Sequence, residues 1–162
     1  MRKLKLEMQV SIDGFTADRD GNTDWMVWDW TDPWTWDDAL RRYHTSLTTS
    51  SDCLLLSRKM ADEGFLDHWA GVARDASMPQ SSFAAHITGM RKMVFSKTLE
   101  KPAWKGVELV TGRMVEKVAR LKAEQGADIL VYGGPTFASS LVDADLVDEF
   151  HWFVNPAVLG DG

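Results

Sequence analysis

Hydrophobic and polar residues alternate over the opening stretch of the chain. The apolar side chains stand at every second residue, namely Leu4, Leu6, Met8, Val10 and Ile12. A period of two predicts a β-strand with one apolar face. The other face carries Glu7, Gln9 and Ser11, whereas a strand that is covered on both faces is apolar throughout. This strand is therefore either the edge of a sheet or has one face that looks into a cleft.

The rest of the chain alternates between short apolar runs and longer segments with helical spacing. The runs that predict strands are residues 53–56, 92–96, 107–110, 129–132 and 150–154. Helices are predicted from Asp37 or Asp38, over 58–65, over 79–87 with Ser77 as a cap, over 115–125 before Gly126, and over 135–143. The first of them carries Leu40, Tyr43, His44 and Leu47 on one face. This alternation predicts a single α/β domain over residues 1–162, with a mostly parallel central sheet covered by helices.

The composition excludes several classes of binding partner and says less about the fold. The net charge is -6 and the pI about 5.1, whereas a protein that binds nucleic acid presents a basic face. No apolar run approaches the roughly 20 residues that cross a bilayer, and the N-terminus shows no signal-peptide stretch. The lone Cys53 cannot form an internal disulfide, and the four histidines lack metal-ligand spacing. We therefore expect a cytoplasmic protein without a nucleic-acid, membrane or metal partner.

Residues 129–141 carry the strongest indication of function. An apolar strand meets the pair Gly133 and Gly134, and Pro135 then suits the first turn of a helix. The N–H groups expected to point out of this helix end are those of Thr136, Phe137 and Ala138. Exposed donors at the positive end of a helix dipole favour phosphate, and glycine lets another molecule approach the backbone. The alternative is a tight strand–helix turn that binds no ligand.

Tryptophan is concentrated in one segment. Five of the eight tryptophans fall between Trp25 and Trp36, where Pro33 interrupts any regular spacing. Large exposed rings are costly. The segment therefore packs over its own core, packs against a second subunit, or lines a pocket for a flat ligand.

Several short segments follow one another in a specific order. Among them are Leu-Leu-Leu-Ser-Arg-Lys at 54–59 and Val-Tyr-Gly-Gly-Pro-Thr-Phe at 131–137. The others are residues 11–17, 20–21, 24–25, 94–99, 146–149 and 155–162. The series resembles the dihydrofolate-reductase-like family related to the C-terminal reductase domain of the bacterial riboflavin biosynthesis protein RibD. The resemblance covers essentially the whole chain.

This resemblance implies a dihydrofolate-reductase-like three-layer α/β/α domain, NADPH as hydride donor, and a homodimer. By position, the adenosine side of NADPH would be held by Ser57, Arg58, Lys59, Ser96, Lys97 and Thr98. The diphosphate would be held by Gly133, Gly134, Pro135, Thr136 and Phe137. The nicotinamide would lie beside Val10 and Ser11. The substrate pocket would be lined by Gln9, Trp25, Trp28 and Trp30.

The chemistry of these segments suits NADPH, with some departures from the family pattern. A 2′-phosphate needs fixed cations, which Arg58, Lys59 and Lys97 supply, although the first two could equally form a solvated helical turn. Ser57 stands where the family usually has glycine, and Met60 where it often has threonine, so both positions are expected to weaken NADPH binding. Family members also continue into a strand hairpin that completes the sheet, and we expect this hairpin to be missing here.

Reduction needs a proton as well as a hydride. Folate-reducing relatives place a carboxylate on the helix after the tryptophan-rich loop, which makes Asp37 and Asp38 candidates, and Glu7 in the expected cleft is a third. The aspartates could instead stabilise the helix N-terminus. We expect an NADPH-dependent reductase of a small planar heterocycle, of pterin or pyrimidine type. The alternatives are a dimeric module that binds a nucleotide or flat ligand without turnover, and a structural dimer joined by its tryptophans.

Overall fold

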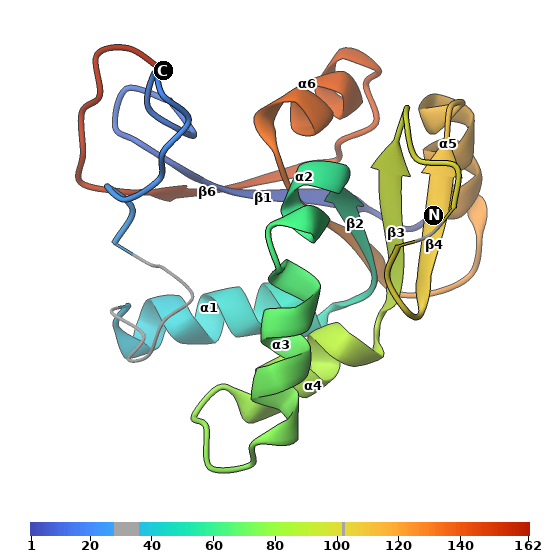
Figure 1. Ribbon diagram of the computed structural model, residues 1–162, viewed down its shortest axis with the longest axis horizontal. Helices are drawn as coiled ribbons and strands as arrows, with labels where there is room; N and C mark the ends of the chain where they lie inside the picture. The colour runs from blue at the N-terminus through green and yellow to red at the C-terminus, as the bar shows by residue number, and fades with distance from the viewer. Residues whose placement is uncertain (28–35, 102) are drawn as a thin grey trace.

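The computed structural model describes residues 1–27, 36–101 and 103–162. Its centre is a six-stranded sheet in the order β4-β3-β2-β5-β1-β6, in which all the paired strands are parallel (Figure 1). The strands are β1 (Leu4–Val10), β2 (Ser51–Ser57), β3 (Arg91–Ser96), β4 (Val107–Thr111), β5 (Asp128–Tyr132) and β6 (Glu149–Val154). The helices are α1 (Asp38–Thr49), α2 (Arg58–Asp62), α3 (Phe65–Arg74), α4 (Ser81–Gly89), α5 (Met114–Ala123) and α6 (Pro135–Asp143).

Helices cover both faces of the sheet and so make three layers. On one face, residues of α1, α3 and α4 pack against Leu54, Leu130 and Phe153. On the other face, α5 and α6 pack against Leu6 and Val131. Figure 1 shows α6 on one side of the strands and α1, α3 and α4 on the opposite side. The predicted α/β fold with a dihydrofolate-reductase-like, three-layer arrangement is confirmed, and the sheet is parallel throughout its described pairs.

The helix starts follow local side-chain chemistry. The Asp37 carboxylate caps α1 by accepting from the N–H of Leu40 at 2.8 Å. We predicted that Ser77 caps α4, and this prediction is wrong. The Ser77 hydroxyl donates to Asp75 at 2.6 Å instead. The predicted helix over 58–65 is also wrong in length. Gly64, at φ +89°, separates α2 from α3, which the prediction did not contain.

β1 is not an edge strand, and α1 covers its polar face at Glu7. It pairs with β5 on one side and with β6 on the other. Glu7 on its polar face is only 7% exposed, because α1 covers it. The polar residues of β1 therefore reflect a buried hydrogen-bonded cluster, described below.

No helix among the described residues combines the length and the apolarity needed to cross a bilayer.

Candidate functional site

The predicted cofactor residues lie along one edge of the sheet. Strands β3, β2, β5 and β1 are consecutive in the sheet, and all four end on the same side because they are parallel. Their last or next residues are Ser96, Ser57, Gly133 and Ser11. Three inter-strand spacings of about 4.8 Å span roughly 14 Å, which suits an extended dinucleotide. Open α/β sheets bind ligands at this carboxyl edge.

The glycine pair serves the protein's own packing. A Cβ on Gly133, which has φ +153°, would lie 3.2 Å from the backbone nitrogen of Ser57. A Cβ on Gly134 would lie 3.2 Å from the Ser57 hydroxyl oxygen. A side chain at either position would therefore press on Ser57, against its backbone from Gly133 and against its hydroxyl from Gly134. The structure brings these two predicted segments into contact.

The helix end after the glycines offers fewer free donors than we predicted. The N–H groups of Phe137 and Ala138 donate to the Gly134 carbonyl at 3.0 and 3.1 Å. Of the three predicted donors, only Thr136 keeps an N–H without an acceptor among the described residues. The prediction was wrong for the other two because the chain tightens into the helix at Pro135. Phe137 stacks on Phe95, with ring centroids 4.9 Å apart.

The turn after β2 is organised by Ser57 and Arg58. Ser57 caps α2 by accepting from the N–H of Met60 at 3.2 Å. The Arg58 guanidinium donates to Asp62 at 3.0 Å and to the Thr98 hydroxyl at 2.7 Å. Arg58 thus links the ends of β2 and β3, which were both predicted to hold the adenosine side of a nucleotide.

The other two predicted cations differ in their pairing. Lys59 lies 3.6 Å from the carboxylate of Glu63, and both side chains are exposed. Lys97 is exposed and forms no ion pair with any residue that the structure describes. It follows Ser96, whose buried hydroxyl accepts from the N–H of Thr98 at 3.2 Å. The turn after β3 therefore presents an unneutralised ammonium beside a fixed backbone.

The end of β1 is held by the C-terminal segment. The hydroxyl of Ser11 donates to Asp13 at 2.7 Å and accepts from the N–H of Phe15 at 2.9 Å. The Asp13 carboxylate also accepts from the N–H groups of Gly160 at 2.7 Å and Leu159 at 3.2 Å. These hydrogen bonds, led by that of Ser11, lower the pKa of Asp13 to about 2. Figure 1 shows the loop after β1 beside the C-terminus.

Asn155 links the predicted substrate side to the same segment. Its buried side chain donates to Gln9 at 3.1 Å and accepts from the N–H of Val27 at 2.8 Å. Trp25, on the loop, donates from its indole nitrogen to the Asn22 carbonyl at 3.2 Å. The structure therefore brings Gln9 and the near end of the loop together. The other two predicted pocket residues, Trp28 and Trp30, lie outside the described residues.

A buried polar cluster lies beneath this side of the site. His44 Nε2 lies 2.9 Å from Glu7 Oε1 and 3.1 Å from the Tyr132 hydroxyl, which in turn lies 2.9 Å from the Thr48 hydroxyl. Burial, followed by the charge of Glu7, raises the pKa of Tyr132 well above its ordinary value. Sequence reasoning named Glu7 alone. His44 on the buried face of the predicted helix was the available signal for the rest.

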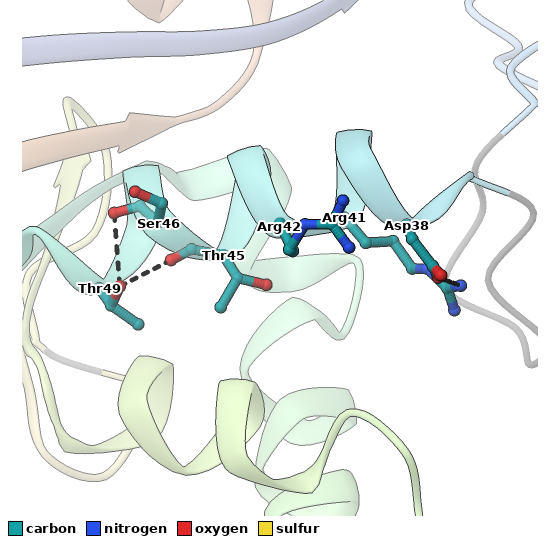
Figure 2. A pocket seen from close by; sticks show the side chains of 6 residues that line it. All are labelled: Asp38, Arg41, Arg42, Thr45, Ser46 and Thr49. Atoms are coloured by element: carbon teal, nitrogen blue, oxygen red, sulfur yellow. Dashed lines mark hydrogen bonds and ion pairs between the residues drawn. The ribbon is translucent and has the colours of Figure 1, made fainter.

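The two aspartates lie at the N-terminus of α1. Asp37 is engaged in capping the helix, and Asp38 is exposed and paired with Arg41. Asp38 also borders an open hollow of about 530 Å³ on the outer face of α1 (Figure 2). The other lining residues are Arg41, Arg42, Thr45, Ser46 and Thr49. No residue at the carboxyl ends of the strands lines this hollow. Its size alone does not indicate a ligand, so we place the site at the strand ends.

Comparison with known proteins gives one family. The sequence profile described as RibD C-terminal domain matches residues 2–162. The uncharacterized protein YyaP of Bacillus subtilis (strain 168) is 28% identical over 163 residues, which is 99% of this chain and 78% of that protein.

Solved structures share the fold. A protein of Shewanella sp. PV-4, provisionally assigned to riboflavin biosynthesis, has a TM-score of 0.65 at 22% identity. The match includes 99% of this chain and 80% of the Shewanella protein. The diaminohydroxyphosphoribosylaminopyrimidine deaminase/5-amino-6-(5-phosphoribosylamino)uracil reductase of Thermotoga maritima has a TM-score of 0.60 at 16% identity. RibD of Acinetobacter baumannii has a TM-score of 0.65 at 16% identity. In both of these, 99% of this chain covers less than half of the other, 46% and 47%.

Proposed function

Because the chain belongs to the RibD C-terminal domain family, we propose that it is a reductase of the riboflavin-pathway type, which uses NADPH to reduce a small planar heterocycle. The observation that carries the proposal is the row of turns after β3, β2, β5 and β1. The family and the Thermotoga maritima neighbour, whose name includes a 5-amino-6-(5-phosphoribosylamino)uracil reductase, support an oxidoreductase. A pyrimidine or pterin derivative is the substrate class that we assign, and a cytoplasmic location and a homodimer complete the proposal.

The residues of this row fit a phosphorylated dinucleotide. Arg58, Lys97 and the Thr98 hydroxyl would hold the 2′-phosphate, since charged and hydroxyl donors converge there. The Thr136 N–H at the start of α6 would meet the diphosphate. When bound, NADPH supplies the hydride. Val10 and Ser11 would form the wall beside the nicotinamide, because they end the strand next to β5.

The substrate would lie on the side of the row where β1 meets the tryptophan-rich loop. Gln9 is fixed there by Asn155, so its amide can orient a polar heterocycle. Asp37, Asp38 and Glu7 are the candidate sources of the proton. Glu7 differs from the aspartates by its burial, which keeps it apart from bulk water.

The second candidate function is a dimeric module that binds a nucleotide or flat ligand without turnover. The observation that favours it is that the N–H groups of Phe137 and Ala138 donate to Gly134, which leaves few backbone donors at this helix end for a diphosphate. Met60, at the usual threonine position, adds no hydroxyl. Both functions predict nucleotide binding, and only the reductase predicts consumption of NADPH.

A fluorescence titration separates these functions. Bound NADPH should quench tryptophan emission and take up excitation energy through its reduced nicotinamide. Saturable quenching at sub-millimolar NADPH, with loss of absorbance at about 340 nm upon addition of an aminopyrimidine riboside or a dihydropterin, is the expected result. Quenching without consumption across these compounds would favour the binding module. The absence of quenching would rule out the proposed reductase.

A further inference from the structure

We infer that Glu7, His44 and Tyr132 form a buried proton-holding unit beneath the substrate side of the site. In this unit Glu7 gives up the proton that accompanies the hydride, and His44 and Tyr132 are positioning residues that act through Glu7. The inference rests on the proposed function for its role in turnover. The unit itself can be measured without any substrate.

Three elements that are distant in sequence build the unit. Glu7 lies on β1 opposite Tyr132 on β5, so both side chains leave the same face of the sheet. His44 reaches down from α1, and its Nε2 contacts Glu7 Oε1 at 2.9 Å and the Tyr132 hydroxyl at 3.1 Å. Thr48, one helical turn further along α1, holds that hydroxyl from the other side at 2.9 Å. One imidazole nitrogen therefore connects a carboxylate and a phenol.

Because the unit is buried, gaining or losing a proton changes its free energy strongly. The exposed fractions are 7% for Glu7, 0% for His44 and 7% for Tyr132. Glu7 Oε2 is buried and has no hydrogen-bond partner among the described residues. A carboxylate left half-satisfied in an apolar layer is costly, and a proton or a ligand donor on that oxygen removes the cost. The unit is therefore poised to take up and give up one proton.

The other titratable groups around Glu7 are already engaged. Lys5, on the same face of β1, pairs with Asp128 at 2.7 Å. His151, beside Glu7 on β6, is bonded to the Tyr43 hydroxyl at 2.7 Å and to Glu149 at 3.3 Å. From α4 the unit meets the Phe83 ring, whose centroid lies 4.9 Å from that of His44. Among the residues that the structure describes, His44 and Tyr132 are thus the titratable groups in contact with the Glu7 carboxylate.

The position of the unit matches the place where a proton is needed. Gln9 follows Glu7 on the same face of β1, and Tyr132 directly precedes Gly133. Trp36, where the described chain resumes after the loop, meets the His44 ring edge-on at 5.2 Å. Glu7 and His44 share one proton between Oε1 and Nε2. In the proposed step the O–H bond of Glu7 breaks as an N–H bond forms on the heterocycle, which leaves Glu7 as a carboxylate and His44 as a neutral imidazole. Solvent restores the shared proton after the product leaves.

Asp37 and Asp38 lack this arrangement. Asp37 is engaged in capping the helix N-terminus, and Asp38 is paired with Arg41 in solvent. Among the three candidate carboxyl groups, Glu7 is the one that combines burial with a free oxygen and a histidine partner.

The test is an NMR titration of the histidine rings in the 162-residue protein. We compare the wild type with Glu7→Gln, Tyr132→Phe and, as a control, His86→Asn. His86 lies on α4 and bonds to the Ser51 carbonyl at 3.0 Å, away from the unit. Because Glu7→Gln replaces the carboxylate that contacts Nε2 with a neutral amide, the His44 titration curve should move relative to that of the wild type. The midpoint should move detectably in Tyr132→Phe and stay fixed in His86→Asn.

The pH profile of turnover supplies the second readout. Tyr132→Phe should lower kcat about tenfold and move the pH profile of kcat while KM stays close to that of the wild type, which a purely structural role would not do. A His44 midpoint that is the same in the wild type, Glu7→Gln and Tyr132→Phe would overturn the unit. If Glu7→Gln does not fold, an unmoved midpoint in Tyr132→Phe alone overturns it. A shifted midpoint without NADPH binding would refute the proposed reductase and leave the unit standing. NADPH oxidation with an unmoved kcat profile would refute the role in turnover.

Discussion

Gly133 has a packing role beside the binding role that we propose for it. Its backbone lies at φ +153°, and a side chain there would press against the Ser57 nitrogen at 3.2 Å. We expect Gly133→Ala to lower the free energy of unfolding by about 1–3 kcal/mol, the usual cost of a non-glycine residue in a disfavoured conformation. Chemical denaturation measures this change.

The matched control for this substitution is Gly71→Ala. Gly71 lies inside α3, and a Cβ there would meet nothing within 4 Å. Alanine is the better helix former by about 1 kcal/mol, so this variant should be as stable as the wild type or more stable. Equal destabilisation by both substitutions would contradict the packing role that we assign to Gly133.

Arg58 and Lys97 are the side chains that should distinguish NADPH from NADH. Only NADPH carries the 2′-phosphate. Because both side chains are exposed, we expect Arg58→Ala or Lys97→Ala to weaken NADPH binding by about tenfold and NADH binding much less. Lys59→Ala, which removes a cation paired with Glu63, is the control. Equal losses for the two nucleotides in calorimetric titrations would show that the phosphate is bound elsewhere.

At the scale of elements, α1 depends on its N-cap residue, Asp37. Asp37 accepts from the Leu40 N–H, and an amide oxygen at the same place can do so too. Asp37→Ala should therefore cost about 1 kcal/mol of unfolding free energy, and Asp37→Asn only a fraction of that. A similar loss for both variants in urea denaturation would indicate that the charge, and not the cap, stabilises the helix.

The loop after β1 should keep its anchor in acid. Asp13 holds that loop to the C-terminal segment, and its hydrogen bonds lower its pKa to about 2. A depressed pKa in the folded state means that the stabilisation is complete above the unfolded value near 3.9 and is lost as the pH falls toward 2. The stability difference between the wild type and Asp13→Asn should therefore be constant near pH 6 and shrink between about pH 4 and 2. A difference that does not change with pH would show that the carboxylate charge is not involved.

Elements were predictable from sequence where burial repeats locally. The first strand follows from its alternation and the other five from short apolar runs, whereas α1, α5 and α6 follow from helical spacing, because a helix buries one face and a strand in a covered sheet can bury both. The boundary between α2 and α3 was missed, because Gly64 breaks the helix through a backbone conformation and not through a change in hydrophobicity. The polar face of β1 was misjudged for a different reason. Its neighbours come from distant parts of the chain, and a polar strand face satisfied by a helix looks the same in sequence as an edge strand.

At the scale of the whole molecule, the sheet order determines which predicted segments meet. The turns after β2, β3 and β5 were each predicted as part of a nucleotide site. In the structure these turns follow neighbouring strands and contact one another. The unit of Glu7, His44 and Tyr132 could not be predicted from spacing, because it joins three elements through side chains. The tertiary fold was the missing information.

The claim on which the account depends is that NADPH lies along the carboxyl ends of β3, β2, β5 and β1. Backbone amide chemical shifts recorded during an NADPH titration test it residue by residue. We predict saturable shifts at Ser11, Ser57, Thr98 and Gly133, with little change at Thr45 in the hollow on α1. Shifts centred on the α1 hollow, or no saturable shifts at millimolar NADPH, would contradict the account.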